Sequence, residues 1–216
     1  MKNVVHVVDD DESFRKAVSR QLRAAGHEVA TYESAQQLLA HLPNEGAPGC
    51  ILLDVQLPGL SGPDLQGRMA ELGFPLPIVF LTGKGDIPTS VRAIKAGAED
   101  FLTKPVAEDV LLRAIDRAIA RCIRDSEQQQ RMESLRALIA RLTPRERQVY
   151  ELIVRGNMNK QIARELGTTE RTVKAHRQKV MEKTGAKTLA ELVSISERLA
   201  GMTAAAHEAA DKPNRR

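Results

Sequence analysis

Short apolar runs alternate with amphipathic segments through the first 120 residues, and this alternation constrains the fold more than any other feature. Runs rich in apolar residues predict strands at 4–8, 27–31, 50–54, 77–81 and 99–102. Helices are predicted between them, at 13–25, 34–42, 62–72, 88–96 and from Ala107 onward. Strands that alternate with helices predict an α/β fold, in which a doubly wound parallel sheet carries helices on both faces.

Polar residues follow four of these strands at the point where each strand ends. Asp9, Asp10 and Asp11 follow the first strand, and Asp54 ends the third. Thr82 follows the fourth strand, and Lys104 lies just past the fifth. Because binding sites in parallel sheets form beyond the carboxyl ends of the strands, we expect these side chains to converge on one edge.

The residue types at this edge predict a particular chemistry. Carboxylate oxygens are the ligands that a hard ion such as Mg²⁺ prefers. Asp54 is a candidate nucleophile for a phosphoryl group, with the metal and Lys104 neutralising its oxygens and the Thr82 hydroxyl bonding one of them. A single acid at a strand end more often caps a helix or faces water, but four polar positions at four strand ends favour a site.

The three consecutive aspartates are expected to divide between two tasks. Asp9 and Asp10 face the site past the strand end, and Asp10 is the better candidate for direct coordination of the metal. Asp11 lies with Glu12 and Ser13 at the start of the first helix, where an acid suits the helix dipole. Its loss is therefore expected to cost only about a few tenths of a kcal/mol.

The end of the chain has the pattern of a small all-α domain. Thr143 and Glu146 form a predicted capping box, and Thr169 is a predicted cap. Four helices are predicted, at 144–155, 159–166, 170–183 and 188–200, with Leu189 of the last one facing inward. A short helix, a tight turn and a longer basic helix are typical of a helix-turn-helix.

Charge separates the two halves of the chain. Residues 1–122 carry 13 Lys and Arg against 16 Asp and Glu, a net charge of −3, whereas residues 123–216 carry 19 against 12, a net charge of +7. A basic half favours a polyanionic partner, although a basic helix taken alone is more often a solvated face. An aromatic content of 3% with no Trp argues against stacking platforms for single-stranded nucleic acid.

Residues 107–141 contain neither Pro nor Gly, so a long helical linker joins the two halves. One continuous helix and two helices separated by a break at "DSEQQQ" both fit this segment. The expected organisation is a domain at 1–121, a helical linker at 122–141, a second domain at 142–200 and a flexible tail at 201–216, which has little apolar content.

Other classes of protein are disfavoured. No apolar run is long enough to span a bilayer, and the start of the sequence lacks a signal-peptide core. Cys50 and Cys122 are too few for a disulfide framework or a metal cluster. We therefore expect a cytoplasmic protein with reduced thiols.

Four segments of the first half resemble the receiver domain of two-component response regulators: "VVDDDES", "CILLDVQLPGLSG", "IVFLTGKGD" and "AGAEDFLTKP". The resemblance extends over residues 1–121. It implies a five-stranded flavodoxin-like fold and a cis Lys104–Pro105 bond. It also implies site roles: Asp54 as phosphoacceptor, Asp9, Asp10 and the Gln56 backbone carbonyl as Mg²⁺ ligands, Thr82 and Phe101 as a switch pair, and Lys104 as a phosphate contact.

The second half resembles the LuxR-type DNA-binding domain of the FixJ and NarL regulators, through "LTPRERQVYELIVRGNMNKQIARELGTTERTVKAHRQKVMEKTGAKT". The resemblance implies that 170–183 is the recognition helix. Base contacts are then expected from Lys174, Ala175 and Gln178, because Lys donates to guanine, Gln pairs with adenine and Ala offers a methyl to thymine. The remaining expected DNA-binding residues are Lys160, Thr169, Arg171, Thr172 and Lys179, while His176 could touch DNA or the helix packing.

Together the two resemblances imply a FixJ-like transcription factor. A sensor histidine kinase would phosphorylate Asp54, which would control homodimerisation and binding to double-stranded DNA. An alternative is a regulator of the same build that binds DNA without phosphorylation. A metal-dependent phosphatase of the haloacid-dehalogenase type needs a second Asp two positions after the nucleophile, where this chain has Gln56, so only slow self-dephosphorylation is expected.

Overall fold

The computed structural model describes residues 3–41, 47–74, 76–83 and 87–210. It divides into two compact units, Met1–Glu127 and Gln128–Arg216, which we describe separately. Among the described residues, no helix is both long enough and apolar enough to cross a membrane.

The first unit is built on the predicted parallel sheet. Its strand order is β2-β1-β3-β4-β5, and every neighbouring pair is parallel. Each strand lies within one residue of its predicted position: β1 Val4–Val8, β2 Glu28–Tyr32, β3 Gly49–Asp54, β4 Ile78–Thr82 and β5 Asp100–Thr103. This order is that of the flavodoxin-like fold, so the predicted fold class is confirmed.

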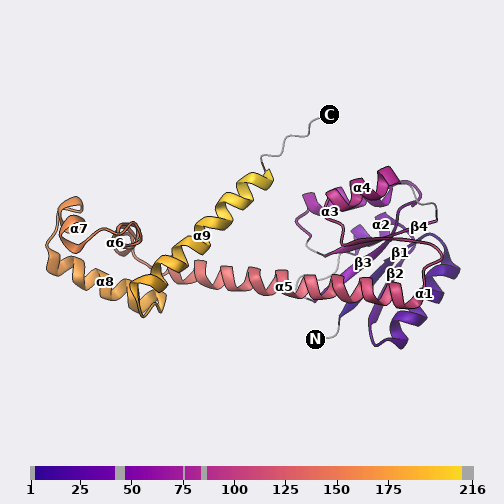
Figure 1. The fold of residues 1–216 in the computed structure, drawn as a ribbon, viewed down its shortest axis with the longest axis horizontal. Coiled ribbons are helices and arrows are strands. Elements are labelled where there is room, and N and C mark those ends of the chain that lie inside the picture. Colours follow the sequence, from indigo (N-terminus) through magenta and orange to yellow (C-terminus); the bar gives the residue numbers. More distant parts are fainter. Residues whose placement is uncertain (1–2, 42–46, 75, 84–86, 211–216) are drawn as a thin grey trace. The chain divides into compact units, whose positions relative to one another are not determined.

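Helices cover both faces of this sheet (Figure 1). One hydrophobic cluster packs one face against α1 and α5, and a second packs the other face against α2, α3 and α4. Successive strand residues point to opposite faces, so Val7 belongs to the first cluster and Val8 to the second. The helices are α1 Glu12–Ala24, α2 Ala35–Ala40, α3 Gly62–Glu71, α4 Ile87–Lys95 and α5 Glu108–Ala140.

Helix α5 is continuous from Glu108 to Ala140, so the alternative with a break at "DSEQQQ" is wrong. The segment consists of residues that form helices readily and lacks Pro and Gly. Ion pairs one turn apart, Arg113–Asp109 and Arg121–Asp125, add to its stability on the exposed side.

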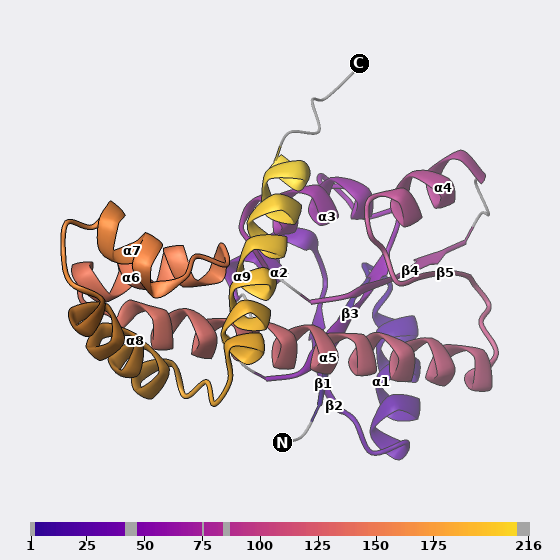
Figure 2. The ribbon, with the colours of Figure 1, turned by 60° about the vertical axis from the view of Figure 1, so that its left-hand side comes forward.

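The second unit contains α6 Pro144–Val154, α7 Asn159–Glu165, α8 Glu170–Thr184 and α9 Leu189–Ala210. Helices α6 and α7 both contact α8 (Figure 2). The core consists of apolar side chains from all four helices, with fully buried residues at Val149, Ile162, Val173, Val180 and Leu192. The capping box predicted from Thr143 and Glu146 is present at the start of α6.

Two expectations for the last helix are wrong. Leu189 is 45% exposed rather than inward, because it is the first residue of α9 and the buried position falls at Leu192. The helix continues to Ala210 rather than ending at residue 200. Residues 201–210 include five alanines, and alanine has the highest helix propensity, so the helix does not require apolar packing to continue. Residues 211–216 of the expected tail lie outside the described residues.

Candidate functional site

The fold brings the two central acids to neighbouring strands. Asp9 directly follows β1, Asp54 is the last residue of β3, and β1 pairs with β3 in parallel. Strand β1 is also the point at which the strand order reverses, where sheets of this class form their binding sites. Asp9 is fully buried and Asp54 is 6% exposed, so both carboxylates require compensating partners.

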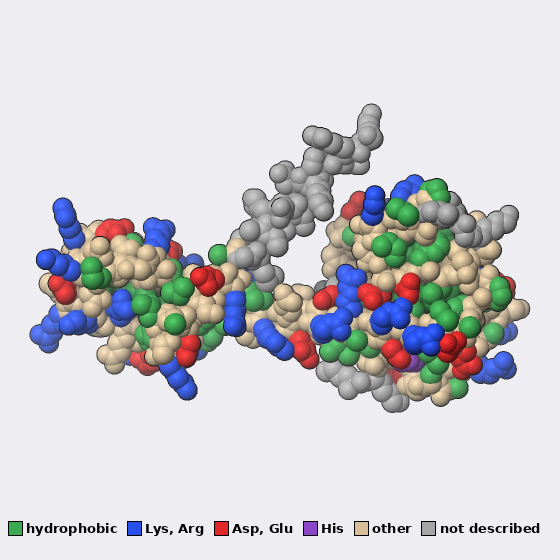
Figure 3. All heavy atoms as spheres, viewed as in Figure 1, with side chains coloured by type: hydrophobic (Ala, Val, Ile, Leu, Met, Phe, Trp, Pro, Cys, Tyr) green, Lys and Arg blue, Asp and Glu red, His purple; other side chains and the backbone are tan. Residues whose placement is uncertain are grey.

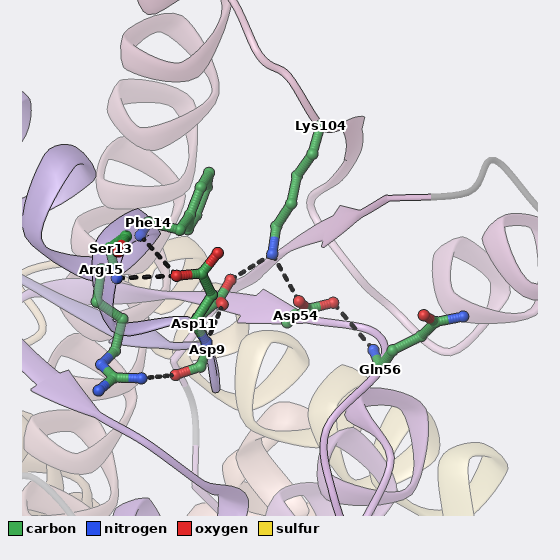
Figure 4. A network of polar contacts seen from close by, with 8 residues as sticks. All are labelled: Asp9, Asp11, Ser13, Phe14, Arg15, Asp54, Gln56 and Lys104. Atoms are coloured by element: carbon green, nitrogen blue, oxygen red, sulfur yellow. Dashed lines mark hydrogen bonds and ion pairs between the residues drawn. The ribbon is translucent and has the colours of Figure 1, made fainter.

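Lys104 supplies that compensation from the loop after β5 (Figure 4). Its Nζ lies 2.5 Å from Asp9 Oδ2 and 2.6 Å from Asp54 Oδ2. The Lys104 backbone N–H donates to the Thr82 carbonyl at 2.7 Å, which anchors the loop to the end of β4. The Lys104–Pro105 bond is cis, as expected.

The remaining carboxylate oxygens are held by backbone N–H groups. Asp9 Oδ1 accepts from the N–H of Asp11 at 3.0 Å, and Asp54 Oδ1 accepts from the N–H of Gln56 at 2.9 Å. Arg15 Nη1 donates to the Asp9 carbonyl at 2.5 Å (Figure 4). Both carboxylates are therefore held in fixed orientations before any ligand binds.

The third acid, Asp10, completes a possible metal site. Oxygens of Asp9, Asp10 and Asp54 all lie within 4.8 Å of one another, and Asp10 is exposed. Three carboxylates face one ammonium, so the cluster keeps a net negative charge, and its donors are all oxygen. This arrangement fits a hard divalent cation such as Mg²⁺.

Burial and ion pairing act in opposite directions on the charged groups. Burial raises the pKa of Asp9, and the hydrogen bond from Lys104 opposes this rise without cancelling it. Burial alone would lower the pKa of Lys104, but the hydrogen bonds to Asp54 and Asp9 outweigh it and raise the pKa. Lys104 is therefore charged at neutral pH and holds the site together electrostatically.

The two expected switch residues, Thr82 and Phe101, differ in their surroundings. Thr82 ends β4 and is 1% exposed. Phe101 lies opposite Phe80 in the β4–β5 register, and the two ring centroids are 6.0 Å apart. Phe101 is half-buried and packs against the core on the α3 and α4 face, so it is not part of the acidic cluster.

Space behind Asp54 is restricted. A Cβ built on Gly62 would lie 2.6 Å from the Asp54 carbonyl oxygen and 2.9 Å from Phe80 Cε1. Gly62 begins α3, and its N–H donates to the Val55 carbonyl. Glycine is required at this position because α3 begins against the backbone of the acidic residue.

Sequence reasoning missed two residues that contact the site, Phe14 and Arg15. Both lie in the first turn of α1, which begins at its N-cap Asp11. The Lys104 ammonium lies 4.3 Å from the centroid of the Phe14 ring. Only their position in the sequence could have predicted this contact, because the first turn of the helix after β1 must lie at the same edge of the sheet.

A second charged surface lies on α8. The three residues expected to contact bases, Lys174, Ala175 and Gln178, are all exposed. Figure 3 shows Lys and Arg side chains on the surface of the second unit. Arg171 is exposed on α8, and Lys160 is exposed on α7.

Several other polar residues at α8 are engaged within the protein. Thr169 caps the helix by accepting from the Thr172 N–H, and the two hydroxyls lie 3.0 Å apart. Lys179 pairs with Glu182 at 2.8 Å. Lys183 pairs with Glu146 at 2.6 Å, so this lysine links α8 to the start of α6. His176 is half-buried, which places it between the packed and the exposed side of α8.

Comparison with known proteins separates the same two regions. Residues 5–116 match the family described as response regulator receiver domain, and residues 140–196 match the family described as bacterial regulatory proteins, luxR family.

Relatives cover nearly the whole chain. Nodulation protein W of Bradyrhizobium diazoefficiens is 45% identical over 92% of this chain and 87% of that protein. The transcriptional regulatory protein FixJ of the same species is 40% identical over 93% of this chain and 97% of that protein. The solved structure of the response regulator StyR is 44% identical, covers 92% of this chain and 100% of that chain, and superposes with a TM-score of 0.82.

Proposed function

Because the chain belongs to the two-component response regulators that join a receiver domain to a LuxR-type DNA-binding domain, we propose that a sensor histidine kinase phosphorylates it on Asp54. The observation that carries this proposal is the buried ion-pair cluster of Asp9, Asp54 and Lys104 at the point where the strand order reverses. The cluster combines a carboxylate nucleophile, a cation for the transferred group and a set of oxygen donors for a metal.

The proposed reaction is phosphoryl transfer to a carboxylate. The donor is the phosphorylated histidine of the kinase. An Asp54 oxygen attacks its phosphorus, the bond from phosphorus to the histidine nitrogen breaks, and that nitrogen keeps the electron pair. Lys104 neutralises the oxygens of the transferred group, and the Gln56 N–H keeps the carboxylate oriented. Asp9, Asp10, Asp54 and the Gln56 carbonyl would hold Mg²⁺, which supplies further neutralisation of phosphoryl charge.

The proposed switch passes from Asp54 to Thr82 and Phe101. Phosphorylation adds negative charge and acceptor oxygens at Asp54, which attract the Thr82 hydroxyl. This movement makes room for Phe101, now half-buried, to turn inward. The changed surface promotes homodimerisation of the receiver, and two DNA-binding units then bind paired half-sites.

We place the DNA interface on α8, which enters the major groove. In this proposal, Lys174, Ala175 and Gln178 contact base edges. Their exposure on the same helix supports this assignment. Phosphate contacts come from a basic and polar set: Lys160, Thr169, Arg171, Thr172 and Lys179. Thr169 is the N-cap of α8 and is bonded to Thr172, and Lys179 pairs with Glu182. These three residues must therefore combine a structural contact with a DNA contact.

The domain boundaries proposed are 1–121 for the receiver, 122–141 for the linker and 142–200 for the DNA-binding domain. A DNA-binding regulator acts where the chromosome is, so we place the protein in the cytoplasm. Gln56 stands where a phosphatase of the haloacid-dehalogenase type has its acid, and we propose that phosphate is lost only by slow self-hydrolysis.

Transfer of label from ³²P-acetyl phosphate in the presence of Mg²⁺ tests the phosphoacceptor. The wild type should take up label, and Asp54→Asn should take up none. Asp125→Asn is the matched control, because Asp125 is an exposed acid on α5 and should leave uptake unchanged. Uptake by Asp54→Asn equal to that of the wild type would overturn the assignment.

Selection of bound fragments from a random DNA pool, with phosphorylated and with unphosphorylated protein, tests the regulatory function. The phosphorylated protein should recover paired half-sites. Recovery of the same sites with the same yield from both forms would favour the alternative, a regulator that binds DNA without phosphorylation.

A further inference from the structure

Three described groups lie against the Lys104 ammonium, and one of them is aromatic. Two are the carboxylates of Asp9 and Asp54, at 2.5 Å and 2.6 Å. The third is the face of the Phe14 ring, whose centroid lies 4.3 Å from Nζ. Figure 4 shows the ring beside the lysine side chain, across from Asp54. The distance is that of a cation–π contact.

The ring is held in place from two sides. Asp11 Oδ1 accepts from the N–H groups of Ser13 and Phe14, which fixes the first turn of α1. The Phe14 side chain packs against the core shared by α1 and α5. The ring therefore does not depend on Lys104 for its position, and it can act as a fixed surface for the lysine.

The three contacts differ in what happens to them during phosphorylation. When Asp9 serves as a metal ligand, its oxygens are shared with a cation that repels Lys104. When Asp54 carries a phosphoryl group, one of its oxygens is bonded to phosphorus as an acyl phosphate, and the negative charge moves out to the phosphoryl oxygens. The contact with Phe14 is neutral, so neither event removes it.

We propose that Phe14 is a positioning residue for phosphoryl transfer, an inference that rests on the proposed role of Asp54. Its ring keeps the Lys104 ammonium directed at the transferred group while the ion pairs to Asp9 and Asp54 weaken. An aliphatic side chain at this position fills space but offers no negative π face, and the ammonium then turns toward water.

An ordinary core role for Phe14 makes a different prediction. A residue that only fills space tolerates Leu, whereas a residue that positions a cation requires an aromatic ring. The comparison of Phe14→Leu with Phe14→Tyr therefore separates the two roles, because Tyr keeps the ring and Leu keeps only apolar bulk.

The functional test is the initial rate of ³²P uptake from acetyl phosphate at saturating Mg²⁺. This small donor avoids any effect of the substitution on docking of a protein partner. We expect Phe14→Leu to slow uptake about threefold to tenfold and Phe14→Tyr to stay within about twofold of the wild type. Phe74→Leu is the matched control, because Phe74 packs against the core on the opposite face of the sheet and should leave the rate unchanged.

The contact itself has a spectroscopic signature, because the ring current of Phe14 acts on protons that lie over its face. In the wild type, the Lys104 ε-methylene protons should be shifted upfield by the ring current, and Phe14→Tyr should preserve that shift. Since this measurement needs only the wild type and the Tyr variant, absence of the shift overturns the inference even where Phe14→Leu does not fold.

The outcomes separate this inference from the proposed function. A wild type that takes up no label overturns the role of Asp54 and the inference with it. A wild type that takes up label, with Phe14→Leu equally fast or Phe14→Tyr as slow as Phe14→Leu, overturns only the inference. Absence of an upfield shift at Lys104 in the folded wild type also overturns it.

Discussion

The acidic site of the first unit and helix α8 of the second are both charged regions, but they differ in the burial and pairing of their charged side chains. Asp9 and Asp54 are buried and share one lysine, whereas Lys174 and Arg171 are exposed. Within the described part of the chain, no ion pair joins Lys174 or Arg171 to an acid. The first arrangement fits a small cation, and the second leaves its charge available to an extended polyanion.

The receiver part of α5 shows that a basic helix alone does not make such a surface. Three of its arginines are paired with acids: Arg113 with Asp109, Arg117 with Asp100 and Arg121 with Glu99. Figure 3 shows Lys, Arg, Asp and Glu side chains interleaved over the first unit. What distinguishes α8 is therefore that, among the residues described, no ion pair joins Lys174 or Arg171 to an acid.

The largest expected effect is on DNA binding. Lys174→Ala should weaken binding to the selected DNA site by about 1–3 kcal/mol, because it removes the proposed base contact. Lys160→Ala should instead weaken specific and non-specific binding alike and reduce the salt slope by about one. Titrations at several salt concentrations measure both.

Arg117→Ala is the control from α5, where the charge is already paired, and it should leave binding unchanged. Equal losses from Lys174→Ala and Arg117→Ala would contradict the difference between the two helices. Unchanged DNA affinity in Lys174→Ala would show that Lys174 makes no base contact.

The two glycines of α3 differ in how closely they are packed. Gly62→Ala should destabilise the first unit by about 1–3 kcal/mol, because the new methyl overlaps the Asp54 carbonyl and the Phe80 ring. Gly67→Ala on the same helix meets nothing within 4 Å and should stabilise by about 0.5–1 kcal/mol. Urea denaturation of the two variants tests this difference in sign, and a stabilising Gly62→Ala would show that the site is loosely packed.

Substitutions in the run of three aspartates separate the acid that caps α1 from the acids proposed to bind the metal. Asp11 is the N-cap of α1, so Asp11→Ala should cost about 1 kcal/mol of stability, more than the few tenths expected from the dipole alone. Uptake of phosphoryl label should stay within about twofold of the wild type, since Asp11 lies outside the metal-binding set.

Asp10→Ala is the matched change one residue earlier. It should leave stability nearly unchanged, since Asp10 is exposed, and should make uptake far less dependent on Mg²⁺. If Asp11→Ala rather than Asp10→Ala changes the Mg²⁺ dependence, the assignment of the two acids is reversed.

The smallest expected effect concerns the support of α8. The hydrogen bond from Lys183, with that from the Thr143 N–H, lowers the pKa of Glu146 to about 2 from its ordinary value of 4.5. Because the folded-state pKa is the lower one, the carboxylate stabilises the fold above about pH 4.5, and this contribution is lost as the pH falls toward about 2.

Glu146→Gln should therefore be less stable than the wild type near neutral pH, and the difference should shrink between about pH 4.5 and pH 2. Denaturation followed through the amide resonances of α8 measures it. A difference that stays constant across that range would mean that the ion pair does not hold α8.

The fold was largely predictable because its signals are local. Apolar runs and helix caps placed every strand within one residue, and the strand-end rule brought Asp9, Asp54 and Lys104 together. The contacts that were missed depend on where a side chain points in the folded structure, which the sequence does not show. Phe14 touches Lys104, and Lys183 turns inward to Glu146, although the sequence shows only an aromatic and one more basic residue.

The length of the last helix was mispredicted for a different reason. Its end was placed where apolar residues stop, but an alanine-rich helix can continue without apolar packing. The continuity of α5 could not be decided from sequence, because "DSEQQQ" is compatible with a helix and with a break.

The most direct test of the link between the two charged surfaces is the affinity of the full-length protein for its selected DNA site, measured with and without acetyl phosphate. We expect phosphorylation to tighten binding by about tenfold or more in the wild type and to have no effect in Asp54→Asn. Equal affinities of the phosphorylated and unphosphorylated wild type would contradict the claim that the acidic site controls α8.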